Sequence, residues 1–164
     1  MWRCVLGLAF CSTLLVPVTA AANDCQPVAD AYNALGKVPA YKQTVVLNGK
    51  PLAEFIVVGD RLYTKRESGW TAVDLGAGGR AATQKKVIPD AASLKGCARI
   101  GDDKVAGKDA VIYAYTPPPM QGGLDLGPQR VWIGTADGLP LRMTSEQAKT
   151  DVTLSFDNVT APVP

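Results

Sequence analysis

Histidine is absent from all 164 residues of the sequence. Its absence removes the commonest general base and zinc ligand, and with it every Ser-His or Cys-His nucleophile pair. A phosphate-binding loop is missing as well, because "GAGGR" at residues 76–80 lacks the spacing and the lysine that such a loop requires. We therefore expect no enzyme: no catalytic residue, no metal site and no cofactor.

The acidic residues leave one catalytic alternative open, an enzyme that works with carboxylates alone. Asp102, Asp103 and Asp137 are its candidate residues. We expect all three in turns, where carboxylates usually cap the chain or keep it soluble. A Ser-Lys enzyme is a further alternative that no motif supports.

An excess of one charge is also missing. The 17 basic residues are nearly balanced by 15 acidic ones, which gives a net charge of +2. Proteins that bind nucleic acids usually carry a strongly basic surface. We therefore expect no nucleic-acid partner.

Long apolar runs are scarce beyond the first residues of the chain. Residues 5–16 form an apolar run that follows Arg3 and precedes "AAA" at residues 20–22, a fit to an A-x-A cleavage site. A run of about twelve residues is shorter than the roughly 20 that span a bilayer. The pattern predicts a signal peptide at residues 1–22, with an N-terminal anchor as the alternative. Residues 23–164 then form a single periplasmic domain without a transmembrane segment.

Cysteine is nearly absent from the expected mature chain. Cys4 and Cys11 lie in the signal peptide, which leaves Cys25 and Cys97. In an oxidising compartment this pair predicts a structural disulfide. A bridge that closes a loop of about 70 residues contributes roughly 4 kcal/mol on the chain-entropy model. The alternative, a redox pair, requires a C-x-x-C motif or a thiol of low pKa, and nothing in the sequence suggests either.

The first mature residues predict a helix. Val28, Ala31, Tyr32 and Leu35 recur at helical spacing and form one apolar stripe, and Gly36 ends it.

Strand patterns follow. "YKQTVVL", "LAEFIVV" and "RLYTK" are separated by the turn signals Asn48-Gly49 and Gly59-Asp60. "GAGGRAATQKK" reads as a flexible basic connection and "IPDAASLKGC" as a short central helix. Further strands follow around expected turns at Asp102-Asp103 and Gly107. The whole predicts an α+β domain, a curved antiparallel sheet of eight to ten strands in a half-open β-barrel, packed on the N-terminal helix and the short central helix.

"VWIGTADGLPLRM" at residues 131–143 predicts a hairpin with its turn at Gly138. Strand alternation places Trp132 on the face opposite to its two neighbours, and Leu139, Leu141 and Met143 on one common face. Pro140 has no N–H for a sheet ladder, so we expect it at an edge or a bulge.

The aromatic residues of the expected strands either fill the core or line a ligand site on the concave face. The candidate lining residues are Tyr63, Trp70, Tyr113, Trp132 and Met143. The loop at residues 117–128, rich in proline and glycine, would then act as a movable lid, and Met120 could contribute to the site.

Several phrases resemble those of a known superfamily. An early helix is followed by "YKQTVVLNGKPLAEFIVVGDRLYTKRESGW", then "VAGKDAVIYAY", and finally "VWIGTADGLPLRM" before "DVTLSFDNVTAP". Over most of residues 25–161 the chain is similar to the periplasmic lipoprotein carriers, the LolA-like and LppX-like proteins, and especially to their small bacterial members. The resemblance implies an unclosed β-barrel wrapped on helices, with a hydrophobic cavity for acyl chains.

The leading hypothesis is a monomeric, non-enzymatic periplasmic protein that binds a lipid or a lipoprotein acyl chain. The alternative is a cell-envelope protein-interaction module with a filled core and no small ligand. The two differ in whether the concave face is left incompletely filled.

Overall fold

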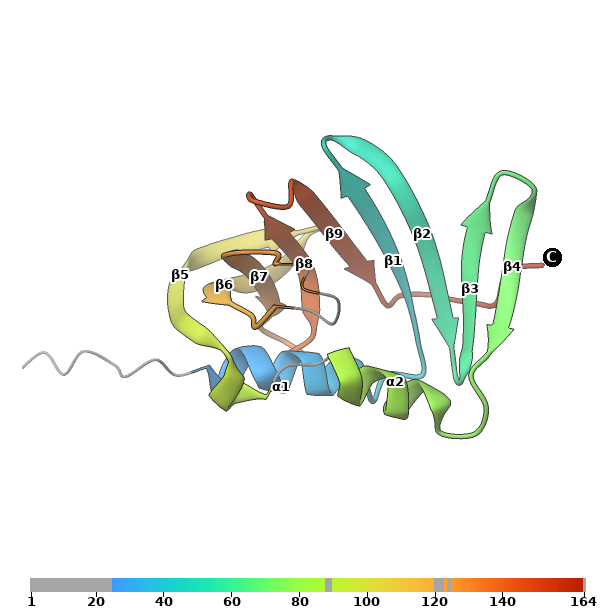
Figure 1. The fold of residues 1–164 in the computed structure, drawn as a ribbon, viewed down its shortest axis with the longest axis horizontal. Coiled ribbons are helices and arrows are strands. Elements are labelled where there is room, and N and C mark those ends of the chain that lie inside the picture. Colours follow the sequence, from blue (N-terminus) through green and yellow to red (C-terminus); the bar gives the residue numbers. More distant parts are fainter. Residues whose placement is uncertain (1–24, 88–89, 120–122, 124, 164) are drawn as a thin grey trace, which may run out of the picture.

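The computed structural model describes residues 25–87, 90–119, 123 and 125–163. The predicted signal peptide lies outside these residues, as do Met120 and part of the predicted lid. Within them the chain forms a nine-stranded sheet, two α-helices and one 3-10 turn (Figure 1). The predicted α+β class is confirmed.

Helix α1 spans Gln26–Leu35 and confirms the first predicted helix. Proline stands in its first turn, where a missing N–H is tolerated. Val28, Ala31 and Leu35 of the predicted apolar stripe are buried, and Gly36 caps the C-terminus.

All nine strands belong to one antiparallel sheet. They are β1 (Ala40–Leu47), β2 (Lys50–Val58), β3 (Arg61–Arg66), β4 (Gly69–Asp74), β5 (Lys95–Val105), β6 (Lys108–Thr116), β7 (Gln129–Gly134), β8 (Pro140–Ser145) and β9 (Thr150–Ser155). Their order is β4-β3-β2-β1-β9-β8-β7-β6-β5, so the first and last strands pair in the middle. β4 and β5 stand at opposite ends and do not pair with each other. The sheet is therefore an open half-barrel, as predicted.

The hairpin turns follow the predicted chemistry with one exception. Asn48 and Gly49 take positive φ values of 51° and 73°, and Gly138 takes 68°, as tight turns require. Asp102 and Asp103, however, lie inside β5 and pair with β6, so the turn predicted there is wrong. The turn predicted at Gly107 is confirmed and forms the β5–β6 hairpin, because the positive φ of a two-residue loop matters more than the turn preference of aspartate.

The central helix lies earlier in the chain than the sequence predicts. The connection expected to be flexible contains α2 (Gly79–Val87), whereas the predicted central helix is only the 3-10 turn η1 (Ala91–Ser93). The carboxylate of Asp60, far away in sequence, accepts hydrogen bonds from the N–H groups of Gly78 (3.0 Å) and Arg80 (3.1 Å) at the start of α2. These bonds satisfy donors that a helix start leaves free, and no local pattern reveals them.

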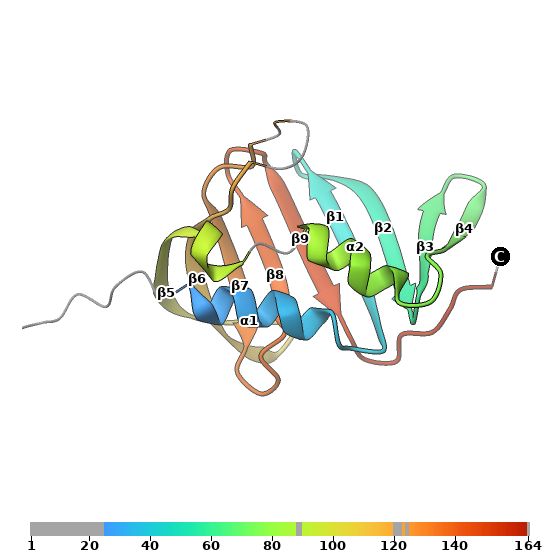
Figure 2. The ribbon, with the colours of Figure 1, turned by 60° about the horizontal axis from the view of Figure 1, so that its bottom comes forward.

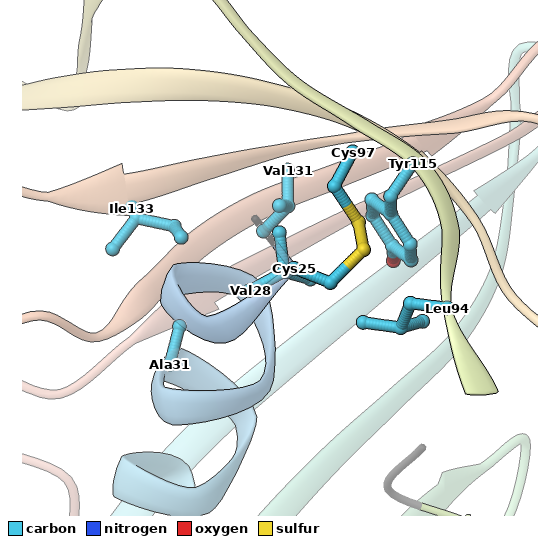
Figure 3. Packing of buried hydrophobic residues seen from close by; sticks show 8 residues of the cluster. All are labelled: Cys25, Val28, Ala31, Leu94, Cys97, Tyr115, Val131 and Ile133. Carbon is cyan, nitrogen blue, oxygen red and sulfur yellow. A yellow bond between two sulfur atoms is a disulfide. The ribbon is translucent and has the colours of Figure 1, made fainter. Parts of the chain in front are cut away.

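Both helices lie on the same face of the sheet, α1 over β7 and β8 and α2 over the β9-β1-β2 region (Figure 2). We call this the inner face and the opposite one the outer face. The larger core cluster lies between α1 and the inner face (Figure 3) and consists of Cys25, Val28, Ala31, Leu94, Cys97, Tyr115, Val131 and Ile133. A smaller cluster on the outer face contains Ala110, Trp132 and Leu141.

The predicted disulfide is present. Cys25 and Cys97 are bonded, with Cα atoms 5.1 Å apart and a sequence separation of 72. Both residues are buried within the α1 cluster. The bond ties the start of α1 to β5 and so fixes the helix over this half of the sheet.

Replacing both cysteines with serine should lower the free energy of unfolding by about 2–4 kcal/mol, because the unfolded chain regains the entropy of a large loop. Urea unfolding of the oxidised wild type and of the double variant measures the difference. Reductant should destabilise the wild type and leave the variant unchanged; equal stability of the two oxidised proteins would contradict the role of the bond.

Candidate ligand-binding face

Strand alternation and register define which side chains share the inner face. On β1, Tyr41, Gln43 and Val45 point inward, while Lys42 and Thr44 point outward. Cross-strand pairing extends each set across the whole sheet. One inward row, in sheet order, is Tyr113, Val131, Met143, Val152, Val45 and Ala53.

The half of the inner face beneath α1 is filled. Met143 packs against the core cluster, and Tyr32 Oη of α1 lies 2.8 Å from its Sδ and 2.5 Å from Tyr115 Oη. The Tyr115 hydroxyl also donates to Gln129 Oε1. Burial raises the pKa of Tyr115 to about 12 and that of Tyr32 well above its ordinary value, so both hydroxyls remain protonated donors. These contacts leave no place for a ligand among themselves.

The other half of the inner face is apolar but only partly covered. β1 is partly exposed along its whole length, and Phe55 and Leu62 of the neighbouring strands are partly exposed as well. Val73 on β4 is 52% exposed, whereas Val57 between them is buried. We call this half the open face and define it by its partly exposed or exposed apolar side chains, Val45, Phe55, Leu62 and Val73.

Arg80 of α2 lies over the inner face at the start of β1, beside the open face. It is 8% exposed, and its two terminal nitrogens donate to the carbonyls of Val38 (2.6 Å) and Leu35 (2.7 Å). These carbonyls belong to the C-terminal end of α1 and the residues after it, where a positive charge is favourable. Arg80 Cζ lies 5.3 Å from the centre of the Tyr41 ring on β1. The side chain therefore joins α2, α1 and the sheet.

Tyr41 is the inward side chain beneath Arg80. Burial raises the pKa of its hydroxyl, and the nearby Arg80 charge and a hydrogen bond from Gln84 oppose that rise. Among the described residues, Arg80 Nε and Gln84 Oε1 are buried without a hydrogen-bond partner.

The five predicted lining residues are not brought together. Tyr113 and Met143 lie on the inner face, within or beside the filled core. Trp132 lies on the outer face, and so do Tyr63 and Trp70, which share the outward register of β3 and β4. An aromatic residue can be recognised in a strand from sequence, but its face depends on register, and one residue of slip reverses it.

The surroundings of Trp132 explain its burial. Trp132 Nε1 donates to Asp103 Oδ2 (2.9 Å), and Arg142 Cζ lies 4.9 Å from the centre of its ring. Arg142 in turn forms a two-pronged ion pair with Asp151, at 3.0 and 2.6 Å. The Trp132 hydrogen bond is the main cause that holds the pKa of Asp103 below its ordinary value. This network contributes to structure rather than to an open site.

Tyr63 and Trp70 belong to a charged part of the outer face. Lys65 Nζ lies 5.8 Å from the centre of the Trp70 ring and 3.6 Å from Glu54, which also pairs with Lys42 at 2.8 Å. The outer face of β1–β4 thus carries ion pairs, whereas the inner face of the same strands is mainly apolar.

The β7–β8 hairpin differs from its predicted geometry in the face that Leu141 occupies. Trp132 faces away from its neighbours and Pro140 lies beside a bulge, as predicted. Leu141 and Met143 do not share a face, because the bulge turns Leu141 toward Trp132 while Met143 stays with α1.

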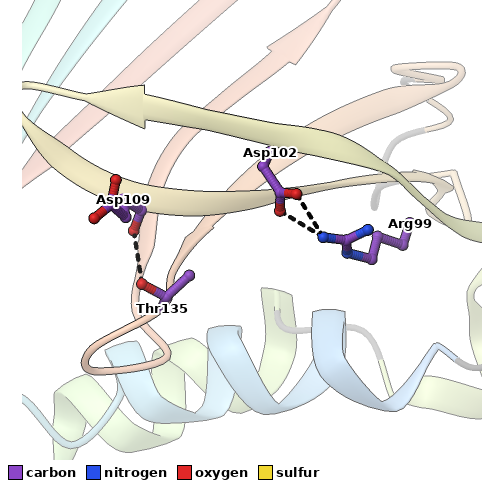
Figure 4. Close-up of polar contacts among 4 residues, drawn as sticks. All are labelled: Arg99, Asp102, Asp109 and Thr135. Atoms are coloured by element: carbon purple, nitrogen blue, oxygen red, sulfur yellow. Dashed lines mark hydrogen bonds and ion pairs between the residues drawn. The ribbon is translucent and has the colours of Figure 1, made fainter.

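The candidate carboxylates are engaged separately. Both carboxylate oxygens of Asp102 bind Arg99, at 2.6 and 2.7 Å (Figure 4). Near the start of β6, the backbone carbonyl of Asp109 accepts a hydrogen bond from the Thr135 hydroxyl, which follows β7 (Figure 4). Asp137 Oδ1 accepts the N–H of Leu139 at 3.0 Å inside the hairpin turn. The described part of the chain holds no cluster of three or more metal-ligating side chains. None of its helices is long and apolar enough to cross a membrane.

Solved structures share this arrangement. No protein-family model and no curated protein matches the sequence. The lipoprotein LppX of Mycobacterium tuberculosis superimposes with a TM-score of 0.53 at 14% identity, over 85% of this chain and 96% of LppX. The chain has an LppX-like fold. At this level of identity the similarity concerns the fold alone, and it confirms the half-open barrel that the sequence resemblance implied.

Two further structures agree. LprF from Mycobacterium bovis gives a TM-score of 0.51 at 19% identity, over 86% of this chain and 94% of LprF. MucB, in complex with MucA(peri), gives 0.50 at 18% identity over 86% of this chain but only 59% of MucB. The LppX-like unit therefore corresponds to about three fifths of MucB.

Trp132→Phe should raise the pKa of Asp103 toward its ordinary value, because the variant lacks the indole N–H that stabilises the carboxylate. A group with a lowered pKa stabilises the folded state above its unfolded pKa and loses this effect as the pH falls through the folded pKa. The stability gap between wild type and variant should therefore be larger at neutral pH than well below about pH 3.9, the ordinary aspartate pKa. NMR titration of the Asp103 carboxyl and thermal unfolding at both pH values test this. Trp70→Phe is the matched control, and an unchanged Asp103 titration in Trp132→Phe would contradict the account.

Proposed function

We propose that this protein is a periplasmic, non-enzymatic, monomeric binding protein whose open face holds an apolar ligand, a lipid or a lipoprotein acyl chain. The observation that carries the proposal is the contrast between two halves of one sheet face. Beneath α1 the inner side chains of Tyr115, Val131 and Ile133 are buried, whereas on β2–β4 Phe55 and Leu62 are partly exposed and Val73 is exposed. The Cys25–Cys97 bond supports an oxidising compartment.

Energetics favour a ligand at this place. Each 100 Å² of apolar surface that a ligand removes from water contributes about 2.5 kcal/mol. An acyl chain has no polar groups to satisfy, so it suits a face that offers aliphatic and aromatic side chains. Tyr113 and Met143 border this face through their row with Val45, and they remain proposed lining residues at its inner end. Trp132, Trp70 and Tyr63 lie on the other side of the sheet and are not part of this proposal.

A protein-binding role is the second candidate. MucB, one of the proteins with this fold, has been solved in complex with MucA(peri). In this chain β4 ends the sheet, and no described strand pairs with its free side. An edge strand offers backbone N–H and C=O groups to an added strand. This candidate predicts crosslinks from β4 to a partner protein and no uptake of apolar probes.

Phe55→Gln should weaken the binding of the neutral fluorophore N-phenyl-naphthylamine at least tenfold, because it removes an aromatic side chain from the open face. Ile56→Gln is the matched control: its side chain is also partly buried, but it points to the outer face of the same strand. Fluorescence titration of the three proteins measures the affinities, and thermal unfolding confirms that all are folded.

Two outcomes would contradict the proposed function. If the wild type does not take up the fluorophore, the open face holds no apolar ligand. If Ile56→Gln weakens binding as much as Phe55→Gln does, the probe does not sit on the inner face.

A further inference from the structure

Arg80 carries a buried charge without an opposite charge. None of the ion pairs among the described residues includes it. Asp60 is a neighbour, but its carboxylate binds the backbone N–H of Arg80 and not the guanidinium. Buried charges are normally paired, because removing them from water is unfavourable. Two carbonyls and an aromatic ring compensate this one only in part.

Two buried polar groups near the start of α2 have no hydrogen-bond partner, one on Arg80 and one on Gln84. The terminal nitrogens of Arg80 are bound to Leu35 and Val38, which leaves the Nε–H without an acceptor. Gln84, one helical turn later, also has a buried and unpaired Oε1. A 180° rotation of the Gln84 side-chain amide would put Nε2, an N–H donor, at the present position of Oε1. Oε1 would then face Tyr41 and could accept a hydrogen bond from its hydroxyl group. Only two of the five N–H groups of the Arg80 guanidinium are bound, so Arg80 itself retains at least two donors and a positive charge, which match the two oxygens of a carboxylate.

This polar region lies at the end of an apolar row. Tyr41, beneath Arg80, pairs across the sheet with Val57, then Leu62, then Val73 at the edge strand. From the Tyr41 ring, which the Arg80 guanidinium covers, the row passes the buried Val57 and reaches the open face at Leu62 and Val73. A charged end joined to an apolar path is the pattern that an anionic amphiphile complements.

We infer that the ligand of the open face is a carboxylate-bearing amphiphile such as a fatty acid, with its carboxylate on Arg80 Nε and its chain directed along the Tyr41 row to Leu62 and Val73. This inference rests on the proposed function and specifies its ligand class. Two donors suit a carboxylate better than a phosphate ester, which brings more oxygens and usually more charge.

The test compares cis-parinaric acid with its methyl ester, two fluorescent chains that differ only in the charge of the head group. The wild type should bind the acid at least tenfold more tightly than the ester. Gln84→Glu places a carboxylate of the protein beside Arg80, so it should abolish the preference for the acid, retain the ester and raise the thermal unfolding midpoint. Arg80→Gln should also abolish the preference, and Gln84→Glu keeps the test valid if Arg80→Gln does not fold.

The outcomes separate the two claims. Equal affinity of the wild type for acid and ester would overturn the inference and leave the proposed function intact. Failure of both probes to bind would overturn the proposed function as well. Stronger binding of dodecyl phosphate than of dodecanoate would replace the carboxylate by a phosphate and thus overturn the inference.

Discussion

The disulfide between Cys25 and Cys97 fixes α1 over one half of the sheet, and the division of the inner face depends on that position. With α1 in place, Val28 and Val131 are fully buried and the hydroxyl groups of Tyr32 and Tyr115 meet in the core. The helix is only ten residues long, so it cannot cover nine strands. α2 lies over the β9-β1-β2 region (Figure 2), and beside it Phe55, Leu62 and Val73 of the inner face keep exposed apolar surface.

α2 completes this arrangement through Arg80 rather than through an apolar stripe. Its start is capped by Asp60 from the β2–β3 turn, and its buried guanidinium holds the last carbonyls of α1 above the Tyr41 ring. These bonds make the region structural, yet they leave the guanidinium Nε–H without an acceptor. In the inferred complex this side chain would connect the fold to the ligand, because the guanidinium covers the Tyr41 ring at which the apolar row begins.

Sequence reasoning recovered the features that local chemistry determines. The period of α1, the glycine turns, the bulge beside Pro140 and the disulfide each follow from neighbouring residues or from a pair of cysteines. α2 was missed because its cap comes from Asp60, and the additional turn predicted at Asp102-Asp103 is wrong because these two aspartates, although typical of turns, lie inside β5. The lining residues were chosen by type, whereas register decides their face: Trp132 and Met143 occupy neighbouring strands and opposite sides. Arg80 carried no sequence signal, since its burial results from contacts with distant carbonyls.

The central claim is that an apolar chain lies on the inner face of β1–β4. Intermolecular NOEs between a carbon-13-labelled fatty acid and the methyl groups of the full-length protein test it most directly. The account predicts contacts to Val45, Leu62 and Val73 and none to Ile56, which points to the outer face of β2. Contacts confined to Ile56 or other outer-face methyl groups, or no contacts at all at saturating ligand, would contradict it.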